Sequence, residues 1–128
     1  MTFADYCDGI QHIGIPTADF AASKAFYTKL GFTCPFETVL NDVQHVMFLQ
    51  LGSLMLEVYE DETAKTAGAI NHYAINCQNI QAAYEKAVAE GYTILSNGIE
   101  SLPFWENGVS FFIIEGPDKE RIEFNQRF

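Results

Sequence analysis

The sequence repeats itself at a fixed offset. The segment IQHIGIPTADF at positions 10–20 aligns with INHYAINCQNI at positions 70–80. Each segment has a histidine at its third position, His12 and His72, and 72 − 12 = 60. Further identical pairs at this offset include Ile10/Ile70, Ile15/Ile75, Ala22/Ala82, Gly31/Gly91 and Thr33/Thr93. The pairing predicts a chain built from two related modules.

The sequence pattern of each module predicts a strand, a helix and then three strands. In the first module, a strand over 10–15 ends at Pro16, because proline cannot donate a hydrogen bond within a sheet. A helix follows from an N-cap at Asp19 to about Leu30, with Gly31 as its C-cap. The remaining strands are expected at 32–40, 43–51 and 54–60.

The second module predicts a strand over 70–77 and a helix over 80–90, between an N-cap at Asn79 and a C-cap at Gly91. Three strands are expected near 92–95, 109–115 and 120–126. Positions 96–108 read as a long irregular loop.

The 128 residues fit one domain with modules at about 8–60 and about 70–128, joined by a linker at 61–69. Half of such a chain buries too little apolar surface to be stable alone. With 48% hydrophobic residues, the two halves together can fill a core. The expected fold class is α+β, with two βαβββ modules whose sheets curve around a shared cleft.

Composition excludes several function classes. The formal net charge of −10 argues against a nucleic-acid surface, which needs clustered Lys and Arg. No apolar run is long enough to span a membrane, and the acidic start MTFADYCDGI is unlike a secretory signal. Cys7, Cys34 and Cys77 show no zinc-type pairing, so reduced thiols in a cytoplasmic protein are expected.

Each module also supplies one glutamate in its last predicted strand, Glu57 in LMLEVYE and Glu123 in ERIEFNQ. Side chains alternate across a strand, so the apolar neighbours of each glutamate face the opposite way. An isolated histidine or glutamate in a strand is usually a surface or core residue. Their recurrence in both modules instead predicts a metal centre formed by His12, Glu57, His72 and Glu123. Such a set of N and O donors favours Ni, Co, Mn, Fe or Zn over Ca or Mg.

Nearly the whole chain resembles the vicinal oxygen chelate superfamily, in particular glyoxalase I (lactoylglutathione lyase). HIGIPTADFAASKAFYTKLGF is similar to the family's opening strand and helix. FFIIEGPDKERIEF is similar to its closing hairpin, with Lys119 where the family usually has glycine. The resemblance implies two βαβββ modules that form an open barrel-like mixed sheet around a metal cleft. The family's four ligand positions fall on His12, Glu57, His72 and Glu123.

The implied activity is proton transfer next to a carbonyl, as in methylglyoxal detoxification. A hemithioacetal is converted to a lactoyl thioester, and a divalent metal (Ni, Co or Zn, with Mn or Fe as further candidates) stabilises an ene-diolate. By resemblance Glu123 is the catalytic base, with Glu57 as the alternative. The resemblance also implies a homodimer. An unpaired sheet edge in each module supports this expectation.

The substrate stays open at this point. Glyoxalase I enzymes commonly place an arginine four residues after the first ligand, to hold a glutathione carboxylate, and this position is Pro16. The alternatives are an epimerase or isomerase of the same superfamily acting on a non-glutathione substrate, or a resistance protein that binds a small molecule.

Four further residues are candidates for substrate binding. Arg121 and Asn125 flank Glu123 on its strand face, and Phe104 and Trp105 lie in the long loop. A surface ion pair is the alternative for Arg121, and a small hydrophobic plug or a subunit contact is the alternative for the two aromatic residues.

Overall fold

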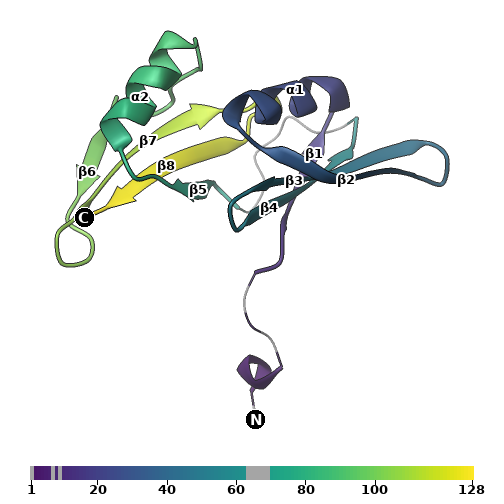
Figure 1. Cartoon of the computed structure of the whole chain (residues 1–128), viewed down its shortest axis with the longest axis horizontal. Helices are drawn as coiled ribbons and strands as arrows, with labels where there is room; N and C mark the ends of the chain where they lie inside the picture. The colour runs from purple at the N-terminus through teal and green to yellow at the C-terminus, as the bar shows by residue number, and fades with distance from the viewer. Residues whose placement is uncertain (1, 7, 9, 63–69) are drawn as a thin grey trace. The chain divides into compact units, whose positions relative to one another are not determined.

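A computed structural model describes residues 2–6, 8, 10–62 and 70–128 (Figure 1). Cys7 and most of the expected linker lie outside the described residues. The chain divides into two compact units, Met1–Ala64 and Lys65–Phe128. No helix in the described ranges combines the length and apolar character needed to cross a membrane.

The first unit begins with a short 3-10 helix and then follows the predicted order of elements. Its elements are η1 (Phe3–Asp5), β1 (Ile13–Thr17), α1 (Phe20–Leu30), β2 (Thr33–Leu40), β3 (Gln44–Leu51) and β4 (Leu54–Glu60). The second unit repeats the order with β5 (Tyr73–Asn76), α2 (Ile80–Ala89), β6 (Glu100–Leu102), β7 (Val109–Glu115) and β8 (Arg121–Arg127).

The two sheets have the same topology. The first has the strand order β1-β4-β3-β2 and the second β5-β8-β7-β6. In each sheet the first strand runs parallel to the last, and the other neighbours are antiparallel. The α+β class and the two βαβββ modules are therefore confirmed. Each sheet is open, with two edge strands, and neither closes into a barrel.

The parallel register is also the same in the two modules. Gly14 pairs with Glu57 across β1 and β4, and Ala74 pairs with Glu123 across β5 and β8. Gly14 and Ala74 are equivalent positions of the repeat, since 74 − 14 = 60. The glutamates are further apart, at 123 − 57 = 66, because the second module has a longer connection before β7. The structure preserves the strand register across this insertion.

One face of each sheet is packed against a helix. In the first unit α1 covers a fully buried layer, and in the second unit Tyr84 of α2 meets the Phe112 ring at 5.3 Å. The fully buried apolar residues are Tyr27, Met47, Leu49, Leu56 and Val58 in the first unit and Phe112, Ile114 and Ile122 in the second. Because Leu56, Val58 and Ile122 adjoin the two glutamates in sequence, the glutamates face away from the helices.

The helix N-termini form as predicted. The Asp19 carboxylate accepts a hydrogen bond from the Ala22 N–H at 3.0 Å, and the Asn79 side chain accepts one from the Ala82 N–H at 3.0 Å. Gly31 caps the C-terminus of α1 in the left-handed region, with φ 107°. The second helix ends one residue earlier than predicted, with Glu90 rather than Gly91 as its C-cap.

The prediction that Pro16 ends the first strand was wrong. β1 begins three residues later than expected and continues through Pro16 to Thr17. Among the described strands, β1 lies at the edge of its sheet and pairs with β4 alone, so proline can occupy it without breaking a central ladder. The expected strand at 70–77 is likewise shorter, at Tyr73–Asn76. His12 and His72 therefore immediately precede β1 and β5 instead of lying within them.

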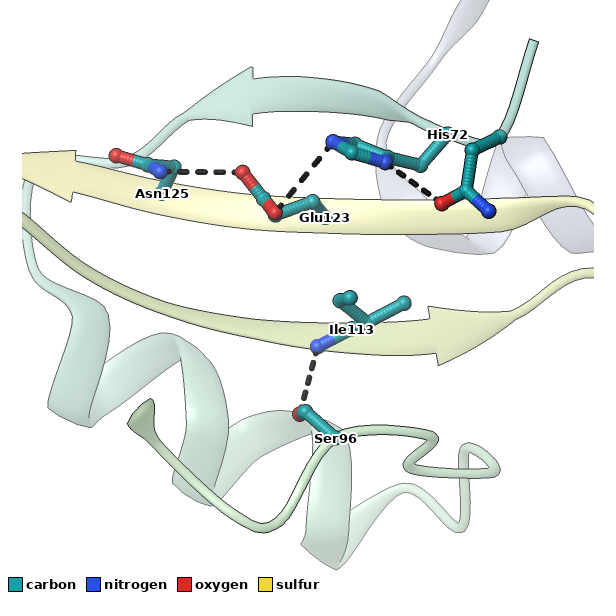
Figure 2. Close-up of polar contacts among 6 residues, drawn as sticks. His72, Ser96, Ile113, Glu123 and Asn125 are labelled. Atoms are coloured by element: carbon teal, nitrogen blue, oxygen red, sulfur yellow. Dashed lines mark hydrogen bonds and ion pairs between the residues drawn. The ribbon is translucent and has the colours of Figure 1, made fainter. Parts of the chain in front are cut away.

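The prediction of a strand at 92–95 was also wrong. Only an isolated bridge between Ile94 and Ile114 forms there. The Ile113 N–H donates to the Ser96 hydroxyl at 2.9 Å, so a side chain takes the place of a strand carbonyl (Figure 2). The outer strand of the sheet is instead β6, inside the segment expected to be an irregular loop.

We expect the helix caps to contribute measurably to stability. Asp19→Ala removes an acceptor from the first turn of α1, so the free energy of unfolding should fall by about 1 kcal/mol. Urea denaturation measures the change. Asp19→Asn keeps the acceptor and should lose much less, and equal losses in the two variants would contradict the capping role.

Candidate metal centre

The first unit brings His12 and Glu57 together on the sheet face opposite α1. The Nε2 atom of His12 lies 4.0 Å from Oε2 of Glu57. The imidazole also meets the Phe48 ring edge-on, with the ring centroids 5.6 Å apart. Both polar side chains are about one-third exposed. This arrangement leaves a nitrogen and a carboxylate oxygen close to each other and accessible.

The second unit repeats this arrangement with His72 and Glu123 (Figure 2). The Nε2 atom of His72 lies 3.7 Å from Oε1 of Glu123. The other oxygen of the same carboxylate accepts a hydrogen bond from the Asn125 amide at 3.1 Å. The Glu123 side chain is only 13% exposed, against 32% for Glu57. Glu123 is thus the more enclosed and the more tightly held of the two carboxylates.

An amide side chain orients each histidine. Nδ1 of His12 lies 3.0 Å from Oε1 of Gln11, and Nδ1 of His72 lies 2.9 Å from Oδ1 of Asn71. An amide oxygen can only accept, so the assigned tautomer in each case carries its proton on Nδ1. In the neutral ring, Nε2 then carries the lone pair and faces the glutamate. Metal-binding histidines are typically fixed by the same kind of contact at the second nitrogen.

The spacing of each pair fits a shared divalent ion. At 4.0 Å and 3.7 Å, the two N···O distances are too long for hydrogen bonds. Two donor atoms that each lie about 2.0–2.2 Å from one ion are at most about 4.4 Å apart. Both distances fall below this limit, and neutral imidazole with carboxylate is a donor set suited to Zn and its transition-metal neighbours.

Each unit by itself holds two donors. Among the described residues, no group of three or more His, Cys, Asp and Glu side chains comes together. The structure therefore places His12 with Glu57 and His72 with Glu123. The convergence of the two pairs on one ion stays a prediction.

The four predicted substrate-binding residues all lie in the second unit. Asn125 contacts Glu123, whereas Arg121 is exposed at the start of the same strand. Phe104 and Trp105 are 54% and 68% exposed in the connection between β6 and β7. Their contact with a substrate also stays a prediction.

Sequence reasoning missed the two amides, Gln11 and Asn71. A signal was present, because an amide residue directly precedes each repeated histidine. The pair differs in length by one methylene, so it does not count as an identity. Each amide nevertheless places its oxygen at the equivalent nitrogen, Nδ1, of the histidine that follows it.

The chain matches a family model and one curated protein over most of its length. The family model described as Glyoxalase/Bleomycin resistance protein/Dioxygenase superfamily matches residues 9–124. Over 126 residues, the chain is 34% identical to "Uncharacterized protein YwbC" of Bacillus subtilis (strain 168), covering 92% of this chain and 97% of that protein.

Two solved structures share the fold at lower identity. A glyoxalase family protein from Enterococcus faecalis superposes with a TM-score of 0.78 at 22% identity, covering 94% of this chain and 98% of that one. The fosfomycin resistance protein FosX from Listeria monocytogenes, in complex with Mn(II) and sulfate, gives a TM-score of 0.74 at 14% identity, covering 95% and 94%.

We expect the amides to support metal affinity. Gln11→Leu and Asn71→Leu remove the oxygen that fixes the tautomer and the ring orientation of each histidine. Each should weaken zinc binding by about 10-fold to 100-fold, measured by isothermal titration calorimetry. Gln81→Leu, an amide change on the exposed side of α2, is the matched control and should leave affinity unchanged. Wild-type affinity in both amide variants would contradict the orienting role.

Proposed function

The chain belongs to the Glyoxalase/Bleomycin resistance protein/Dioxygenase superfamily, and on this basis we propose that it is a metal-dependent isomerase or lyase of the glyoxalase I type. The reaction converts the hemithioacetal of methylglyoxal and a thiol into a lactoyl thioester. The observation that carries the proposal is the repeated His–Glu pair, in which an amide contact at Nδ1 directs Nε2 toward a carboxylate in both modules.

His12, Glu57, His72 and Glu123 are the residues proposed to hold the metal. We propose Ni, Co or Zn as the metal, with Mn or Fe as alternatives, and a superfamily member of the same fold binds Mn(II). The bound metal would act as a Lewis acid at the oxygens of the substrate. Two carboxylates compensate the charge of a divalent ion, and four protein ligands leave positions open for those oxygens.

Glu123 is the proposed catalytic base. It takes the proton from the carbon that carries sulfur and hydroxyl, and returns it to the neighbouring carbonyl carbon. The C–H bond broken at the first carbon is replaced by one formed at the second. The hydroxyl proton on the first carbon's oxygen is lost, and the former carbonyl oxygen gains one, so the isomerisation balances without an oxidant or reductant. Two observations favour Glu123 over Glu57: its side chain is less exposed, and the Asn125 amide orients its carboxylate.

The environment of Pro16 favours a substrate other than the glutathione adduct. Pro16 is a half-buried residue of β1, two positions after Gly14 and therefore on the same strand face. Its ring offers neither charge nor a hydrogen-bond donor to a carboxylate. The second candidate function is therefore an epimerase or isomerase of the same superfamily that acts on a non-glutathione substrate, such as a hydroxy-carbonyl compound without a thiol.

A protein that only binds a small molecule, as a resistance protein would, is the third candidate. Zinc-loaded protein incubated with methylglyoxal and a panel of thiols distinguishes the candidates. Thioester formation supports the first, and isomerisation without a thiol supports the second. Saturable binding of a small molecule without turnover supports the third.

We expect Glu123→Gln to remove most turnover while metal binding largely persists. An amide oxygen can still coordinate a metal but cannot accept the proton, so the rate should fall by about 10²-fold to 10⁴-fold. Activity is measured with the hemithioacetal after zinc or nickel loading, and the metal content of each variant is measured in parallel. Glu57→Gln is the matched control, because it makes the same chemical change at the equivalent position. A larger loss in Glu57→Gln would assign the base to Glu57.

We also expect a homodimer. Each sheet has edge strands with unpaired backbone groups, β1 and β2 in one and β5 and β6 in the other, and such edges favour association. Static light scattering at micromolar concentration should give twice the chain mass. A monomer under these conditions would remove the proposal.

The free thiols Cys34 and Cys77 fit the proposed cytoplasmic location, where cysteines stay reduced.

A mixing experiment decides whether one chain or two build each site. His12→Ala inactivates the pair of the first unit, and His72→Ala that of the second. If each site combines pairs from different chains, a mixed dimer has one intact site and the mixture regains activity. If each chain builds its own site, the mixture stays inactive.

A further inference from the structure

Both arginines of the chain lie on one face of β8. Arg121 and Arg127 are the only arginines in the sequence, and each lies an even number of positions from Glu123, since 123 − 121 = 2 and 127 − 123 = 4. The pairing of β8 with β7 is regular from Val109↔Arg127 to Glu115↔Arg121, without a bulge. Side chains at even spacing on a regular strand share a face, so Arg127 lies on the face that carries Glu123 and Asn125.

An aromatic ring holds Arg127. Its guanidinium carbon lies 4.1 Å from the centroid of Trp105, in a cation–π contact. The backbone of Trp105 has φ 62°, a left-handed conformation that is costly for an aromatic residue. Figure 1 shows this connection beside the C-terminal end of β8, where the Phe128 N–H donates to the Gly108 carbonyl at 3.0 Å. Backbone strain of this kind is concentrated at functional sites.

The guanidinium retains hydrogen-bonding capacity. In the described parts of the chain, Arg127 forms neither an ion pair nor a hydrogen bond through its side chain. By contrast, Lys24 and Lys86 are paired with Glu37 and Glu90. The Trp105 ring lies against the guanidinium, whose N–H groups are suited to a planar anion such as a carboxylate.

We propose that Arg127, positioned by Trp105, binds a carboxylate group of the substrate. Glu123 and Arg127 are four positions apart, which corresponds to about 13 Å along the strand. The substrate would then have a reactive carbon near Glu123 and a carboxylate at a distance from it. In a chain with a net charge of −10, this arginine provides local attraction for an anion. The inference rests on the proposed function, because it assigns the far end of the same substrate site. If the contact between Trp105 and Arg127 only holds the β6–β7 connection in place, the protein should bind anionic and neutral forms of a ligand equally well.

A probe of defined length tests the inference without turnover. Suberic acid monohydroxamate chelates a metal through its hydroxamate and carries a carboxylate at the far end of its chain, and its methyl ester lacks that charge. Trp105 is the single tryptophan, so its fluorescence reports binding next to Arg127. With zinc-loaded protein, the acid should bind about tenfold more tightly than the ester by calorimetry. It should also change the emission of Trp105.

Three variants complete the test. Arg127→Met should abolish the preference for the acid, and Arg127→Lys should retain part of it, because lysine keeps the charge without the planar fork. Lys119→Asn is the control, because it removes one positive charge in a turn of the same unit. Lys119 has φ 68°, and asparagine tolerates this left-handed conformation. This control should keep the full preference. Succinic acid monohydroxamate is too short to reach Arg127 and should show no difference between acid and ester.

The outcomes separate the two levels of the proposal. Equal affinity of suberic acid monohydroxamate and its ester for the wild type overturns the role of Arg127 and leaves the metal-dependent function standing. A preference that persists in Arg127→Met, or that the succinic probe also shows, overturns it as well. If neither suberic compound binds zinc-loaded protein, the metal site fails, and the inference that depends on it fails too.

Discussion

The parallel pairing of the first and last strand of each module is the constraint on which the candidate site depends. Gly14↔Glu57 and Ala74↔Glu123 are equivalent pairs, and each histidine lies two residues before the glycine or alanine. Because side chains alternate along a strand, a slip of one residue would turn both glutamates toward the helices. The apolar neighbours Leu56 and Ile122 would then lose their burial. The hydrophobic core therefore fixes the register, and the register places the carboxylates beside the imidazoles.

The division of each sheet into an apolar and a polar face explains why charged groups are tolerated next to a tightly packed core. Helices α1 and α2 cover one face, and the opposite face retains partial contact with solvent. Carboxylates there avoid the full cost of burial. Gln11 and Asn71 complete the arrangement, because their amide oxygens accept hydrogen bonds from Nδ1 and leave Nε2 available.

The glutamate of the second module is more firmly positioned than the glutamate of the first. Glu123 is more enclosed than Glu57 and is bound by Asn125, whereas Glu57 lies beside Phe48. β8 therefore carries the proposed base, its orienting amide and an arginine in contact with Trp105 on one strand face. Under the proposed function, both modules would supply metal ligands, and the second would also supply proton transfer and substrate contact.

The sequence by itself determined the two modules, the helix caps at Asp19 and Asn79, and the presence of one histidine and one glutamate in each module. These features follow from periodicity and repetition, which are local properties. Tertiary structure decided where strands begin and end: an edge position admits Pro16 into β1, and the Ser96 hydroxyl replaces a strand partner for Ile113. It also decided the contact of Trp105 with Arg127, 22 residues apart since 127 − 105 = 22. No local pattern encodes such a contact, because it depends on how the connection before β7 folds back onto the end of β8.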